Sequence, residues 1–184
     1  WPEDTTPIEE TMEAIEILLS QGKIRASGVS NFSREQLDGA HARVPQASNQ
    51  VPYSMVKRDI EAELVPYCIE QNIGIIAYSP MQRGILTGKI KAVRRFNEGD
   101  HRPDTPYYKE NNIIAINAML DEIRPIAESH DVSLAQLVLN WTAAQPGITA
   151  VLAGARNPKQ VTENAGALSF SLTEDDHKSI DQAL

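Results

Sequence analysis

Residues 24–36, IRASGVSNFSREQ, contain a complete passage from strand to helix. The apolar residues of segment 24–30 and its short length predict a β-strand. Ser33 and Gln36 follow with the spacing of a capping box, in which each side chain bonds the backbone N–H of the other residue at a helix start. The stretch therefore predicts a β-strand that passes directly into an α-helix.

The same alternation continues on both sides of this stretch. Thr6 and Glu9 form a second candidate capping box, with Pro7 at the first helical position and Gly22 after the last apolar residue. Further strands are predicted over residues 47–51, 73–78 and 148–153. Further helices are predicted over residues 60–71, 114–129, 134–144 and 158–168, and from Thr173 onward.

Strands separated by helices indicate a parallel sheet with right-handed crossovers, either doubly wound or closed into a barrel. No Gly-x-Gly-x-x-Gly motif follows a predicted strand, which disfavours the doubly wound dinucleotide fold and favours a (β/α)8 TIM barrel. Such a barrel has about eight strands and about 250 residues. The 184 residues are therefore expected to form a single but incomplete barrel domain over 1–184.

The composition limits the class of function. With 41% hydrophobic residues the chain can bury a core, and a net charge of −8 argues against binding nucleic acid or an anionic membrane. The single cysteine, Cys68, fits a reducing compartment, and no leader or long apolar run is visible. We expect a cytoplasmic protein.

Polar residues gather where the predicted strands end: Ser30, Asn31, Gln50, Tyr78 and Ser79. The carboxyl ends of parallel barrel strands open onto one face, where active sites lie. Amide and hydroxyl groups suit a neutral carboxamide, and a tyrosine ring suits stacking on a flat heterocycle. The set predicts a nicotinamide site, although each residue alone could serve a turn or a cap.

A phosphate site is predicted where segment 154–160 passes from strand to helix. Arg156 stands beside a helix start with Asn157 as cap, and free N–H groups at such a terminus attract anions. The alternative is an ordinary cap beside a surface charge. Segment 84–89 resembles a P-loop, but it has the wrong spacing and ends without Ser or Thr. Its glycines are instead expected to allow close approach of the backbone to a pyrophosphate.

Residues 80–112 form a long polar stretch, predicted to be a functional loop or else a solvated insertion. The histidines have no metal-ligand spacing and are expected to be solvated, so no metal site is predicted. Cys68 is expected to lie in the core. No residue is a convincing proton donor, and no catalytic residue is assigned.

These motifs together resemble the aldo-keto reductase family, in family order across nearly the whole chain. The matching segments are residues 28–32, 49–50, 78–80, 83–84, 86–88, 154–156 and 163–164. The resemblance is closest to the branch with bacterial reductases and potassium-channel β-subunits. It implies that the chain is the C-terminal half of a (β/α)8 barrel, beginning just after the family's catalytic histidine.

The resemblance also implies a role for each site residue. Ser30, Asn31 and Gln50 would hold the carboxamide, and Tyr78 would stack on the nicotinamide. The pyrophosphate would be lined by Ser79, Pro80, Met81, Arg83, Gly84 and Leu86. The adenosine end would be held by Gly154, Arg156, Gln160, Glu163 and Asn164, with Arg156 near a 2′-phosphate. NADP(H) is therefore expected in preference to NAD(H).

The implied activity is reduction of aldehydes or ketones to alcohols by hydride transfer, with this chain supplying the cofactor-binding part. The family's Tyr, Lys, His and Asp tetrad is expected upstream, in a missing N-terminal half or another chain. Without that half, the isolated chain is expected to self-associate through open strand edges. The alternatives are an NADP(H)-binding regulatory subunit without turnover and an unrelated phosphate-binding barrel. The substrate is expected to be a small carbonyl compound.

Overall fold

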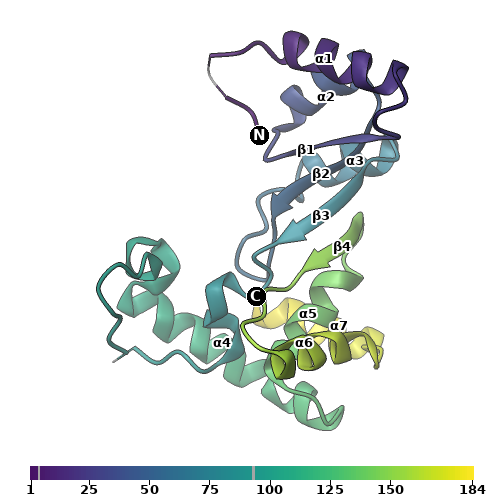
Figure 1. Cartoon of the computed structure of the whole chain (residues 1–184). Helices are drawn as coiled ribbons and strands as arrows, with labels where there is room; N and C mark the ends of the chain where they lie inside the picture. The colour runs from purple at the N-terminus through teal and green to yellow at the C-terminus, as the bar shows by residue number, and fades with distance from the viewer. Residues whose placement is uncertain (4, 93) are drawn as a thin grey trace. The chain divides into compact units, whose positions relative to one another are not determined.

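A computed structural model describes residues 1–3, 5–92 and 94–184 (Figure 1). The chain divides into two compact units. The sheet unit comprises Trp1–Tyr53, Lys57–Tyr78 and Gln145–Leu152. The helical unit comprises Ser54–Val56, Ser79–Ala144 and Ala153–Leu184.

The sheet unit contains a parallel sheet of four strands in the order β1-β2-β3-β4 (Figure 1). The strands are β1 (Ser27–Ser30), β2 (Gln46–Pro52), β3 (Gly74–Tyr78) and β4 (Ile148–Leu152). Ser30 pairs with Gln50, and Pro52 pairs with Tyr78. This register brings the polar carboxyl ends of the first three strands together at one end of the sheet, as the sequence predicts.

Three α-helices belong to the sheet unit: α1 (Ile8–Ser20), α2 (Arg34–Arg43) and α3 (Leu64–Glu70). Helix α2 contacts α1 and β2, and α3 contacts β3. Their apolar faces and the sheet form one core that includes Leu37, Cys68 and Ile75, all fully buried. Burial on this scale supplies most of the stabilisation of such a unit, at about 25 cal/mol per Å² of apolar surface.

Of the two predicted capping boxes at Ser33 and Thr6, the structure contains the first and not the second. The capping box at Ser33 is confirmed, because its hydroxyl accepts from the N–H of Gln36 and the side chain of Gln36 accepts from the N–H of Ser33. The one at Thr6 is wrong. Pro7 has extended backbone, with ψ 141°, and is itself the N-cap of α1 without a side-chain hydrogen bond.

The helical unit contains α4 (Glu110–Ser129), α5 (Leu134–Ala144), α6 (Pro158–Ala165) and α7 (Glu174–Ala183). It also has short 3₁₀ turns: η1 (Gln82–Thr87), η2 (Arg102–Asp104), η3 (Pro106–Tyr108) and η4 (Gly166–Leu168). Helix α5 contacts α4, α6 and η1, and its Leu137, Val138 and Trp141 are almost fully buried. Residues 80–112, apart from residue 93, which lies outside the described residues, contain η1, η2, η3 and the start of α4, so this predicted loop is not one irregular segment.

Glycine is required at one point of the sheet. A Cβ at Gly28 would lie 3.0 Å from the carbonyl oxygen of Ser48 and closer still to the Ser48 hydroxyl. A side chain at this position would therefore require both the Ser48 hydroxyl and the strand backbone to shift. This close approach comes two residues before Ser30, at the end of β1.

No helix in the described part of the chain is both long enough and apolar enough to cross a membrane.

Candidate functional site

Ser30, Asn31, Gln50 and Tyr78 lie together at the carboxyl ends of β1, β2 and β3 in the sheet unit. The hydroxyl of Ser30 and the backbone N–H of Asn31 both donate to the carbonyl oxygen of Gln50, each at 2.9 Å. The side-chain amide of Gln50 has no hydrogen bond to any described residue. It remains a donor and an acceptor for a ligand.

Asn31 has left-handed backbone, with φ 58°, a conformation that asparagine tolerates better than most residues. The hydroxyl of Tyr78 donates to its Oδ1 at 3.0 Å. The Nδ2 of Asn31 has no partner of its own in the described part of the chain and can donate to a carbonyl oxygen. The predicted carboxamide residues thus form one connected group.

The predicted pyrophosphate segment follows β3 and belongs to the helical unit. It has left-handed backbone at Ser79, Gln82, Arg83 and Gly84, with φ of 56°, 44°, 54° and 99°. Each such residue other than glycine costs about 1–2 kcal/mol, so other contacts must hold this turn. The N–H of Gln82 donates to Ser79 O, and that of Gly84 donates to Met81 O, each at 2.9 Å.

Not every residue of this segment is placed for ligand contact. Arg83 is exposed, and Ser79, Met81 and Gly84 are partly exposed. Pro80 is buried, and Leu86 is fully buried in the core of the helical unit. Leu86 packs in the core of the helical unit. The pyrophosphate contact predicted for it would require the turn to move.

The predicted phosphate site is at the N-terminus of α6, where Asn157 caps the helix by accepting from Gln160 N at 3.0 Å. The Oε1 of Gln160 accepts from Arg156 N at 2.8 Å. The expectation of free N–H groups is therefore wrong for these two residues. The guanidinium of Arg156 is exposed and forms no salt bridge with a described carboxylate, so it is available to an anion.

Glu163 and Asn164 extend this region along α6. The Nδ2 of Asn164 donates to Gly154 O at 3.3 Å, which ties the helix to the segment after β4. The Oε1 of Glu163 accepts from the Ser133 hydroxyl at 3.1 Å, just before α5. Both side chains already stabilise the local fold. Helix α5 contacts both α6 and η1 and supports both predicted segments.

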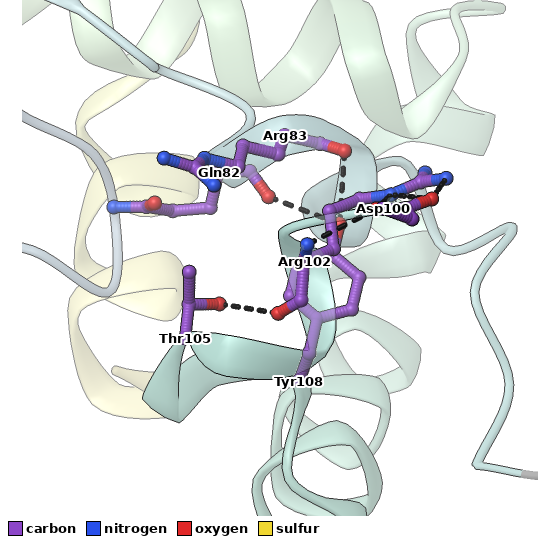
Figure 2. Close-up of polar contacts among 6 residues, drawn as sticks. All are labelled: Gln82, Arg83, Asp100, Arg102, Thr105 and Tyr108. Carbon is purple, nitrogen blue, oxygen red and sulfur yellow. Dashed lines mark hydrogen bonds and ion pairs between the residues drawn. The ribbon is translucent and has the colours of Figure 1, made fainter. Parts of the chain in front are cut away.

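Sequence reasoning missed two residues that hold the turn of η1. The Nε2 of Gln82 donates to the Ser54 hydroxyl at 3.1 Å. The hydroxyl of Tyr108 donates to Arg83 O at 2.8 Å (Figure 2). Both side chains are buried. No sequence pattern indicates that these two side chains are buried.

No metal site is found, because the described residues include no group of three or more His, Cys, Asp or Glu side chains that could hold an ion. The prediction that all histidines are solvated is wrong for His130, whose Nε2 lies 3.0 Å from Asp176 Oδ2. Cys68 is confirmed as a core residue, and burial raises the pKa of its thiol to about 11.

The family model for the aldo/keto reductase family matches residues 1–184. The chain belongs to this family. It is 34% identical over 185 residues to aldo-keto reductase YhdN of Bacillus subtilis, covering 100% of this chain and 56% of that protein. It is also 34% identical to the NADH-specific methylglyoxal reductase of Escherichia coli, covering 93% of this chain and 52% of the relative. A third relative, aldo-keto reductase yakc [NADP(+)] of Schizosaccharomyces pombe, is 35% identical, with 97% and 53% covered.

The aldo/keto reductase fold is confirmed by a solved structure, the glycerol dehydrogenase AKR11B4 of Gluconobacter oxydans. The TM-score is 0.93 at 36% identity, and the match covers 100% of this chain and 56% of that one. The predicted parallel alternation of strands and helices, as part of a (β/α)8 barrel, agrees with this match. The chain spans about half the length of the curated aldo/keto reductases that it matches.

Proposed function

We propose that the protein containing this chain is an NADPH-dependent oxidoreductase that reduces aldehydes or ketones to alcohols, and that this chain supplies the cofactor-binding part. The observation that carries the proposal is the connected group of Ser30, Asn31, Gln50 and Tyr78. Membership of the aldo/keto reductase family supports the same activity.

A nicotinamide fits the unused groups of that set. Its carboxamide has one acceptor oxygen and one NH₂ donor, which match the Nδ2 of Asn31 and the amide of Gln50. The ring of Tyr78 would offer a flat face for stacking. When bound, the reduced cofactor supplies the hydride. The residues described here would orient the ring.

The adenosine end would be held at α6. Arg156 would pair with the 2′-phosphate that distinguishes NADPH from NADH, because a charge-assisted contact with phosphate is stronger than a neutral one. The names of the relatives include an NADH-specific enzyme and an NADP(+) enzyme, so the family uses both cofactors. The exposed and unpaired guanidinium supports NADPH here.

A regulatory subunit that binds NADP(H) without turnover is the second candidate. It would bind the nucleotide through the same residues, Ser30, Asn31, Gln50 and Tyr78, and would differ from the enzyme only in lacking turnover. A carbonyl becomes an alcohol only if a proton joins the hydride, and the donor must lie within hydrogen-bond reach of the carbonyl oxygen. In the enzyme, that donor would come from a missing N-terminal half or from another chain.

The proposal also includes a domain organisation, a substrate class and a location. Residues 1–184 would be one incomplete domain of the barrel, acting on a small carbonyl substrate in the cytoplasm. Neither nucleic acid nor a membrane would be a partner, in keeping with the net charge of −8.

The test is an intact mass of the purified protein beside a fluorescence titration with NADPH and with NADH. We expect a mass well above 20.3 kDa, tighter binding of NADPH, and steady NADPH oxidation with simple aldehydes. Tight binding without oxidation would support the regulatory subunit. Failure to bind either nucleotide would contradict both candidates.

A further inference from the structure

Tyr108, in η3, contacts the backbone of the turn at Gln82 and Arg83. Its hydroxyl donates to Arg83 O at 2.8 Å and lies 3.3 Å from Gln82 O (Figure 2). The side chain is only 6% exposed, so water does not compete freely for these two carbonyl groups. Loss of a partly buried hydrogen bond costs about 1 kcal/mol, so the bond to Arg83 O favours one backbone conformation of the turn.

The two carbonyl groups belong to residues whose left-handed backbone conformation is unfavourable. Gln82 and Arg83 are both left-handed and are followed by Gly84 with φ 99°. Neither residue is a glycine, so the conformation must be stabilised from outside the turn. The side chain of Gln82 donates a hydrogen bond to Ser54. The backbone oxygen of Arg83 accepts a hydrogen bond from Tyr108.

Contacts within residues 96–105, the segment that precedes Tyr108, stabilise the position of its ring. The ring of Phe96 meets the ring of Tyr108 edge to face, with centroids 5.5 Å apart. The guanidinium of Arg102 lies 4.9 Å from the centre of Phe96 and is paired with Asp100 through two nitrogen atoms. Thr105 donates to Arg102 O at 2.8 Å (Figure 2).

Burial raises the pKa of Tyr108, with Arg102 acting in the opposite direction. The hydroxyl therefore stays protonated at neutral pH and remains a donor, with Arg83 O as its nearer acceptor.

We propose that Tyr108 is a positioning residue for cofactor binding: it holds the turn at Gln82, Arg83 and Gly84 in the shape that receives the pyrophosphate. The inference rests on the proposed function, because it takes this turn as part of an NADPH site. It adds a residue that touches no cofactor and acts through the backbone of Arg83.

The test is Tyr108→Phe in the intact protein, with Tyr107→Phe as the matched control. Phenylalanine keeps the ring and its contact with Phe96 and removes only the hydroxyl. The hydroxyl of Tyr107 has no hydrogen bond to any described residue. For Tyr108→Phe we expect the Kd for NADPH to rise roughly tenfold, which corresponds to about 1.4 kcal/mol. We expect no change for Tyr107→Phe.

A second ligand separates positioning from a general loss of folding. Adenosine 2′-monophosphate lacks the pyrophosphate, so its affinity, measured by calorimetry, should be the same in Tyr108→Phe and the wild type. Equal weakening of both ligands, or an unchanged Kd for NADPH, would overturn the inference. If the wild type itself does not bind NADPH, the proposed function fails first. Faster amide hydrogen exchange at Arg83 and Gly84 in Tyr108→Phe would then show that the contact holds the turn without serving this cofactor.

Discussion

The hydroxyl of Tyr78 donates to the side-chain oxygen of Asn31 at 3.0 Å, across a separation of 47 residues. The contact orients the Asn31 amide so that its Nδ2 is left for a ligand. We therefore propose two roles for Tyr78: its ring stacks on the nicotinamide, and its hydroxyl orients the Asn31 amide.

Tyr78→Phe should separate these roles. The ring remains for stacking, but Asn31 loses its orientation, so we expect about fivefold weaker NADPH binding, from about 1 kcal/mol for one hydrogen bond. Fluorescence titration measures this change. Tyr67→Phe is the control, because it removes a similar bond, to Asp38 at 2.9 Å, outside the site. Equal weakening in both variants would point to lost stability rather than lost orientation.

Arg156→Ala should weaken NADPH more than NADH. A charge-assisted bond to phosphate contributes about 1.5–3 kcal/mol, so we expect roughly a 10- to 100-fold rise in the Kd for NADPH and little change for NADH. Lys178→Ala removes an exposed cation from α7 in the same unit and controls for net charge. The same loss for both nucleotides would show that Arg156 does not bind the 2′-phosphate.

Asp176→Asn tests the contact between the Asp176 carboxylate on α7 and the imidazole of His130. Burial raises the pKa of Asp176, but hydrogen bonds from His130 and Thr173 outweigh it, and the folded pKa is below its ordinary value. The charged carboxylate therefore stabilises the fold above its unfolded pKa of about 3.9, and this contribution is lost as pH falls through the folded pKa. We expect the variant to lose about 1 kcal/mol at pH values near 7 and to match the wild type in strong acid.

Urea unfolding at both pH values measures the effect of Asp176→Asn. Asp175→Asn is its matched control, because Asp175 pairs with Lys178 at the surface and such pairs contribute little. A constant difference between Asp176→Asn and wild type at all pH values would show that the charge is not what stabilises this contact.

Cys68 should not react with thiol reagents in the folded protein. It is fully buried, and desolvation raises its pKa to about 11, so the thiolate is scarce and inaccessible at pH values near 8. Ellman's reagent should therefore detect one thiol only after unfolding. Rapid labelling under native conditions would mean that α3 opens readily.

The isolated 184-residue chain should self-associate. In the sheet unit β1 and β4 are the outer strands, and Leu152 on β4 is 46% exposed. Open strand edges with apolar side chains favour pairing between chains. Leu152→Lys should reduce the association in sedimentation velocity. A monodisperse monomer that melts cooperatively would show that the edges do not drive assembly.

Much of the fold could be predicted from the sequence because its signals are local. Helix α5 has the predicted bounds, and the capping box at Ser33 fixes the start of α2. Helix α3 is shorter than predicted, since Arg58 holds Glu61 in a turn before the helix begins. The apolar periodicity does not report such side-chain contacts.

The candidate site could be predicted only in part. Residues at strand ends can be chosen from the order of strands, because parallel strands end on one face. The bond from Tyr108 to Arg83 spans 25 residues and depends on a buried turn with left-handed backbone. No pattern of residue types encodes that contact.

The narrow gap between Gly28 and Ser48 limits how this end of the sheet can be re-engineered. A library that varies Ser30 and Gln50 to accept cofactor analogues changes the ligand contacts directly. A single methyl group at Gly28 would instead push β1 away from Ser48 and carry Ser30 and Asn31 with it. Laboratory evolution should therefore find Gly28 unchanged in every variant that retains cofactor binding, although this residue meets no ligand.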